Sequence, residues 1–181
     1  QDRGYLFSKV IGIGLSSYLM WFLSSIKLLK FKAYSCIIVV LIFLIVNYIV
    51  FQKANAKSLI REKTSTYLNQ EIIFFAILAL AIYIRGFKPE AYGTEKFMDY
   101  GFMTSMMRAD YMPPVDFWFA GEKLNYYYVG QFIATYLSKL SFVPVSHGYN
   151  LMLVTLAALS FVLTGSLVYN MTKNYFSTRN I

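Results

Sequence analysis

Cysteine, histidine and charged side chains are scarce in this chain of 181 residues. With Cys36 as the single cysteine, a disulfide within the chain and a cysteine-based zinc site are excluded. His147 is the single histidine, and nothing near it supports a Ser-His-Asp triad, so we interpret it as a polar residue in a short turn. Charged residues make up 14% of the chain, whereas a soluble domain carries about 25%. This shortage of charge argues against a soluble globular protein.

Hydrophobic residues, in contrast, make up 57% of the chain. Residues 33–51 and 140–172 contain no charged side chain at all. Runs of about 18 or more apolar residues are typical of transmembrane helices, and a soluble helix would interrupt such a run with a polar face. The pattern predicts an all-α, multi-pass transmembrane helical bundle.

Five apolar stretches are predicted as spans of a single transmembrane domain over residues 1–181. They cover residues 5–29, 33–51, 68–84, 125–142 and 150–172, and Lys139 and Pro144 mark the end of the fourth. Five spans put the turn around His147 and the loop 85–123 on opposite sides of the membrane. The chain begins without methionine and stops after a basic segment, so we expect a piece of a longer protein, with the remainder of that chain as a partner.

The net charge of +8 comes largely from lysine and arginine at the ends of the apolar runs. Basic residues at such positions anchor helices at lipid headgroups, and no basic patch interleaved with aromatic residues indicates nucleic acid. Membrane lipid is therefore an expected partner and nucleic acid is not. Segment 53–63 carries four basic residues and the turn 27–32 carries three, which favours a cytoplasmic segment 53–63. We expect a protein of the cell membrane in which loop 85–123 is extracytoplasmic.

Loop 85–123 is the longest connection and carries the residue types that chemistry needs. Thr94 is a plausible N-cap of a helix that ends near Arg108 and, with its apolar residues, could lie in the membrane interface. Glu95 and Asp99 are spaced i,i+4, so they share one face of that helix. They could act as a general base, hold a divalent cation such as Mg²⁺ or Mn²⁺, or orient a basic substrate. The alternative is two solvated acids on the wet face.

Several further residues of this region are candidates for binding a substrate or a lipid phosphate. Arg85 and Arg108 suit a phosphate group because arginine binds it in a bidentate manner; the alternative is interface anchoring, the commoner role near a span end. Three tyrosines open the fourth span, and three in a row point around most of a helix, so at least one should face the interior or the loop. The remaining candidates are Lys96, Asp116, Trp118, Tyr126, Tyr127 and Tyr128.

Three motifs stand in this region: EKFMD at 95–99, PPVDFWFAG at 113–121 and NYYYVG at 125–130. Together with Arg108 they resemble an uncharacterised family of very hydrophobic prokaryotic membrane proteins, which is named for its Tyr-Tyr-Tyr motif. That family usually reads E-K-P-M-D, then P-P-D-P-W-L-A-G, then N-Y-Y-Y-F-G. Here Phe97 replaces a proline, Val115 is inserted, and Phe117 replaces a second proline. The resemblance covers most of the chain.

The layout of that family is similar to the GT-C glycosyltransferases, in which a span leads to an extracytoplasmic loop with acidic residues and the sugar donor is a polyprenyl phosphate. The resemblance implies a membrane glycosyltransferase in which Glu95 or Asp99 is the catalytic base or positions the acceptor, and Arg108 or Arg85 meets the lipid phosphate. A metal is not required. The alternative is a non-enzymatic membrane protein, a transporter subunit or an assembly scaffold. Ion-coupled transport is disfavoured because spans 33–51 and 150–172 carry no charge.

Overall fold

The computed structural model describes residues 4–53 and 57–179. Six helices follow one another in this part of the chain: α1 (Tyr5–Ser25), α2 (Ala33–Lys53), α3 (Lys57–Gly86), α4 (Thr94–Arg108), α5 (Val129–Leu140) and α6 (Val145–Arg179). These described residues form no strand, and one isolated β-bridge pairs Val115 with Lys123. The prediction of an all-helical protein is confirmed.

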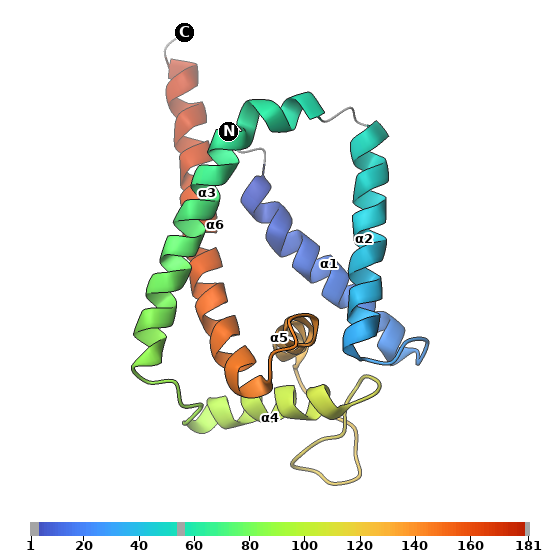
Figure 1. Ribbon diagram of the computed structural model, residues 1–181. Helices are drawn as coiled ribbons and strands as arrows, with labels where there is room; N and C mark the ends of the chain where they lie inside the picture. The colour runs from blue at the N-terminus through green and yellow to red at the C-terminus, as the bar shows by residue number, and fades with distance from the viewer. Residues whose placement is uncertain (1–3, 54–56, 180–181) are drawn as a thin grey trace.

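Four of the helices are long and apolar enough to cross a membrane. They are α1, α2, Thr64–Gly86 of α3 and Val145–Thr172 of α6. α3 and α6 lie side by side, α1 leans away from them, and α2 stands apart and meets α1 near one end (Figure 1). Large apolar side chains cover the outer faces of these helices, which suits contact with lipid.

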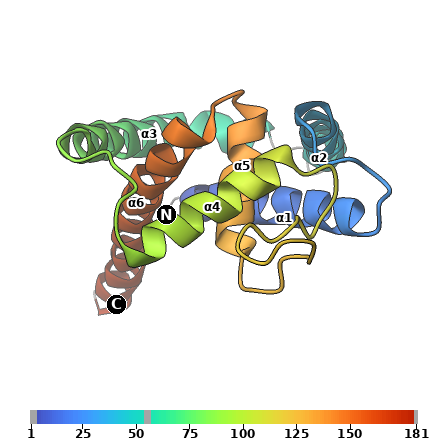
Figure 2. The same ribbon diagram turned by 90° about the horizontal axis from the view of Figure 1, so that it is seen from below.

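The two remaining helices, α4 and α5, close one end of the bundle. α4 runs across the end at which α3 stops and α6 begins (Figure 1). Seen from below, α4 crosses α5, and segment 109–128 loops out beside them (Figure 2). A buried cluster joins them to α1 and α2; it includes Met20, Phe31, Val39, Phe102, Met106, Phe132 and Tyr136. Burial of these side chains holds the polar end of the molecule against the apolar spans.

Helix α5 replaces the predicted fourth span. Its 12 residues rise about 18 Å, well short of the hydrocarbon core of about 30 Å. The three tyrosines before it are not helical, and several of its buried residues are polar: Thr135, Ser138 and Lys139. The described residues thus contain four candidate spans instead of five. Residues 145–149, which were predicted to form a short turn around His147, instead begin helix α6. His147 therefore lies at the same end of the bundle as loop 85–123, because α5 does not carry the chain across (Figure 1).

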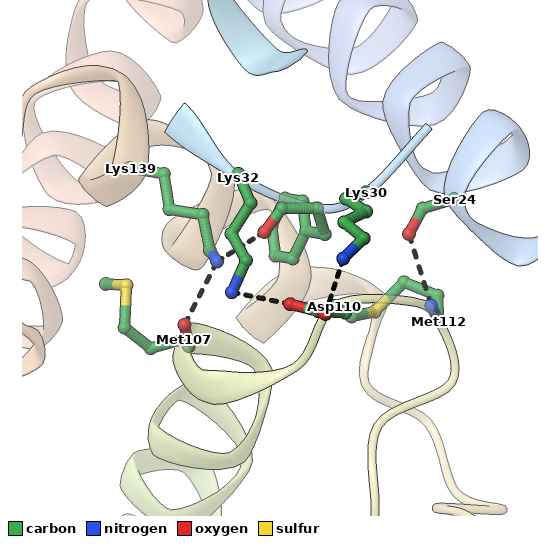
Figure 3. Close-up of polar contacts among 8 residues, drawn as sticks. Ser24, Lys30, Lys32, Met107, Asp110, Met112 and Lys139 are labelled. Atoms are coloured by element: carbon green, nitrogen blue, oxygen red, sulfur yellow. Dashed lines mark hydrogen bonds and ion pairs between the residues drawn. The ribbon is translucent and has the colours of Figure 1, made fainter. Parts of the chain in front are cut away.

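Lys139 of α5 is the buried centre of this end. Lys139 is only 6% exposed to solvent. Lys139 Nζ donates to the carbonyl oxygen of Phe31 at 2.6 Å and to that of Met107 at 3.0 Å, and it lies 4.3 Å from the centre of the Phe31 ring (Figure 3). One ammonium group therefore joins α5 to the α1–α2 connection and to the last turn of α4, whose partial negative charge favours a cation.

Asp110, just after α4, strengthens the same connection. It accepts from Lys32 at 2.6 Å and from Lys30 at 3.2 Å, and its backbone oxygen accepts from the Phe31 N–H (Figure 3). The hydrogen bond from Lys32, followed by the one from Lys30, holds the pKa of the Asp110 carboxyl below its usual value. We call Lys30, Lys32, Asp110 and Lys139 the lysine junction.

Replacement of Lys139 by methionine should destabilise the protein by about 2–4 kcal/mol at neutral pH, because two buried carbonyl groups lose their donor. Burial, and then the nearby charge of Lys32, lowers the pKa of Lys139 from its ordinary 10.5 to about 8. Between these values the unfolded chain binds more protons than the folded one, so this lysine makes folding more favourable as the pH rises from 8 to 10.5.

The measurement is thermal unfolding in detergent across this pH range, for wild type and Lys139→Met. We expect the stability of the wild type to rise relative to that of the variant between pH 8 and 10.5. Lys88→Met, at an exposed position, is the control. The difference in stability between wild type and Lys88→Met should stay constant over this pH range. A constant difference between wild type and Lys139→Met would contradict the burial of a charge at this position.

Chain topology can be tested with single cysteines in a Cys36→Ser background. His147→Cys and Glu122→Cys should react with a membrane-impermeant maleimide from the same side of sealed vesicles, because α5 returns the chain to that side. Gln52→Cys, at the far end of α2, should react only from the other side. Labelling of His147→Cys from the same side as Gln52→Cys would show that residues 125–142 cross the membrane after all.

Candidate functional site

Helix α4 is the element on which most predicted site residues stand. It begins at Thr94, and its N-cap position is taken by Gly93, whose φ of 129° favours glycine. The predicted N-cap, Thr94, is thus the first helical residue instead. The helix ends at Arg108, as predicted, because Ala109 adopts an extended conformation with ψ of 144°. Glu95 lies in the first turn, where the helix dipole favours an anion.

The two carboxylates have different surroundings. Asp99 is half-buried and its Oδ1 accepts a hydrogen bond from Gln131 Nε2 of α5 at 2.6 Å. Glu95, one helical turn earlier, is exposed. Gln131 holds the Asp99 carboxylate toward α5 and was not among the residues predicted from the sequence. A lone glutamine after a glycine carries no sequence signal for this role.

The tyrosine triplet lies beside the carboxylates. A hydrogen bond with Tyr126, and then the negative charges of Glu95 and Asp99, raise the pKa of Tyr127. Tyr126 and Tyr127 are exposed, with ring centres 4.2 Å apart. Tyr128 is half-buried, and its hydroxyl oxygen accepts from Trp21 Nε1 of α1 at 3.1 Å. The prediction that one tyrosine faces the interior is confirmed, although the triplet precedes the helix instead of opening it.

Arg85 lies in the last turn of α3, close to the first turns of α6. Its Nε donates to Asn150 Oδ1 at 2.7 Å, and one terminal nitrogen donates to the Glu90 carbonyl oxygen at 3.4 Å. Asn150 in turn donates to the Pro89 carbonyl oxygen at 2.9 Å. Arg85 thus ties α3 to α6 and to the start of the loop. Tyr149 of α6 packs on Tyr100 of α4, with the two ring centres 6.0 Å apart.

Arg108 lies on the other side of α4 from Asp99. The two residues are nine positions apart, which is about 13 Å along the axis and about half a turn around it. Arg108 lines a cleft of about 670 Å³ between α4 and segment 109–123. The predicted residues therefore separate into two places. Asp99 contacts Gln131 of α5, whereas Arg108 and Asp116 border the cleft.

Asp116 and Trp118 have structural contacts of their own. Asp116 Oδ1 accepts from the backbone N–H groups of Trp118 at 2.8 Å and Phe119 at 3.1 Å, which stabilises the turn. The Trp118 ring is exposed and packs on the Phe117 ring at 4.6 Å. Lys96 is half-exposed, and within the described ranges 4–53 and 57–179 it forms no ion pair with Asp99.

A metal ion would need more ligands than the two carboxylates. In the part of the chain that the structure describes, no group of three histidine, cysteine, aspartate or glutamate side chains could hold one. The Asp99 carboxylate also shares one oxygen with the Gln131 amide. Within the described part of the chain, the residues present do not form a site for Mg²⁺ or Mn²⁺ by themselves.

These features define a helical membrane protein with four candidate spans and a polar, aromatic site at one end of them. The family model described as "Uncharacterized membrane protein (DUF2298)" matches residues 15–181, and the chain belongs to this family. No curated protein and no solved structure matches the chain.

The contact between α4 and the Phe117 ring can be tested with a pair of glycine variants. A Cβ at Gly101 would overlap the Phe117 ring, whereas a Cβ at Gly130 would meet open space. In a Trp21→Phe background, Trp118 is the only tryptophan. Gly101→Ala should shift the fluorescence of Trp118 to the red and increase the quenching of Trp118 by iodide. Gly130→Ala should leave both unchanged, and equal spectra for the two variants would contradict this packing.

Proposed function

We propose that this chain forms part of a membrane glycosyltransferase that transfers a sugar from a polyprenyl-phosphate donor to an acceptor hydroxyl. The observation that carries the proposal is the Asp99 carboxylate, half-buried at the end of the spans and oriented by Gln131 at 2.6 Å. A carboxylate held in one direction is suited to take a proton from a hydroxyl group placed against it. The resemblance of the motifs at 95–99, 113–121 and 125–130 to a family with a layout similar to the GT-C glycosyltransferases supports the same assignment.

In this mechanism Asp99 is the base. The acceptor hydroxyl gives its proton to the Asp99 carboxylate while its oxygen forms a bond to the anomeric carbon of the sugar. The bond from that carbon to the phosphate oxygen breaks, and the lipid phosphate leaves with the electron pair. Gln131 is a positioning residue, because it acts on Asp99 and not on the substrate.

The other predicted residues take supporting roles. Glu95 is exposed one turn away and is suited to bind a second group of the acceptor. Tyr126 and Tyr127 offer exposed rings on which a sugar can stack. Arg85, at the same end of the bundle, is the candidate ligand of the donor phosphate. We take α4 to lie in the membrane interface on the extracytoplasmic side of the cell membrane, as the resemblance implies.

Sugar transfer by the full-length protein, reconstituted with a polyprenyl-phosphate sugar donor, is the direct test. Asp99→Asn should lower kcat by about 10²–10⁴-fold, the usual contribution of a general base. Glu122→Gln is the matched control, because Glu122 is an exposed acid of the same loop outside the cleft and the carboxylate site. Gln131→Leu should lower kcat less and change the pH profile of transfer.

Undiminished transfer by Asp99→Asn would refute Asp99 as the base. Absence of transfer by the wild type with every donor, together with intact folding, would favour the non-enzymatic alternative of a scaffold or transporter subunit.

A further inference from the structure

The cleft on the far side of α4 is a second site that the glycosyltransferase proposal does not use. It has a volume of about 670 Å³, within the usual range for ligand sites. One wall is α4 and the other is segment 109–123, which the β-bridge between Val115 and Lys123 closes into a loop. The residues that matter here are Tyr100, Thr104, Arg108, Pro114, Phe117 and Lys123.

The acidic groups in this cleft are already engaged. Asp110 is bound by Lys30 and Lys32, and one oxygen of Asp116 accepts two backbone N–H groups. Arg108 and Lys123, in contrast, are exposed and form no hydrogen bond or ion pair through their side chains with any other residue that the structure describes. Two cations are therefore available to a ligand, whereas Asp110 and one oxygen of Asp116 are engaged within the protein.

The surroundings of the cleft are also basic. Lys139 binds the Met107 carbonyl oxygen at the end of α4, so it offsets the partial negative charge of that helix terminus next to Arg108. The cleft and the lysine junction together carry five cations, Lys30, Lys32, Arg108, Lys123 and Lys139, and two carboxylates, Asp110 and Asp116. Such an excess favours an anionic ligand.

The floor of the cleft is apolar. The Phe117 ring lies directly on Gly101, whose missing side chain makes the approach possible, and Pro114 is buried beside it. A cleft with free cations above an aromatic floor fits a molecule with a phosphate head and an apolar body. α4 runs across one end of the four candidate spans (Figure 1), and lipid headgroups lie at the ends of membrane-spanning helices.

We propose that this cleft binds an anionic phospholipid of the adjacent leaflet, with Arg108 and Lys123 as ligands of its phosphate group. Arg108 presents a planar fork that matches phosphate oxygens, and Lys123 adds a point charge. The lipid headgroup thereby holds segment 109–123 against α4. This site is independent of Asp99 and of sugar transfer, so the test below has no activity readout.

The experiment uses the full-length protein with Trp21→Phe, so that within this chain Trp118, packed on Phe117, reports on the cleft. The protein is placed in nanodiscs of phosphatidylcholine with increasing phosphatidylglycerol that carries brominated chains near the headgroup. Trp118 should be quenched at lower mole fractions of brominated phosphatidylglycerol than of brominated phosphatidylcholine. Arg108→Gln with Lys123→Gln should reduce this preference roughly thirtyfold, because each basic residue near a surface contributes about 1 kcal/mol.

Two further variants separate a built site from general attraction. Lys88→Gln removes one exposed charge of the same loop outside the cleft and should leave the preference unchanged. Thr104→Phe keeps every charge but fills the cleft, and it should reduce the preference. The inference is overturned if Lys88→Gln acts as strongly as the double variant, if Thr104→Phe has no effect, or if soluble glycerol phosphate displaces the lipid.

Discussion

The buried ammonium group of Lys139 is the constraint on which the rest of this molecule depends. A buried cation costs several kcal/mol unless its donors are satisfied. Here the donors meet the carbonyl oxygens of Phe31 and Met107, and an aromatic ring lies 4.3 Å away. Because Lys139 and its two partner residues come from three separate segments, α5, the α1–α2 connection and the end of α4 must be in place together. The polar end of the protein is thus assembled around one charge.

This arrangement sets the orientation of α4, and α4 in turn separates the two proposed sites. With its last turn held by Lys139, the helix presents Asp99 to Gln131 of α5 and presents Arg108 to the opposite side. An oriented carboxylate near exposed tyrosines suits proton transfer from a hydroxyl group. A cleft with two free cations over an aromatic floor suits the retention of a phosphate. Helical geometry keeps the two sites about half a turn apart.

Two local patterns in the sequence have a different meaning in the folded protein. Lys139 was interpreted as the end marker of a span, because a lysine after an apolar run usually reaches for water. In the structure it turns inward, since carbonyl groups far away in the chain are available to it. The apolar stretch 125–142 was predicted to cross the membrane, but buried Thr135, Ser138 and Lys139 make it a short packed helix. Hydropathy cannot distinguish burial in protein from burial in lipid.

The amino-acid sequence by itself determined that the protein is helical and belongs in a membrane, because long charge-free runs have few other stable environments. It also determined that Glu95 and Asp99 share a helix ending at Arg108, because those features are local. Only the tertiary structure decided that Asp99 meets Gln131, that Arg108 faces a different cleft, and that Lys139 joins three segments. Such pairings depend on contacts between residues up to 108 positions apart, which no local pattern encodes.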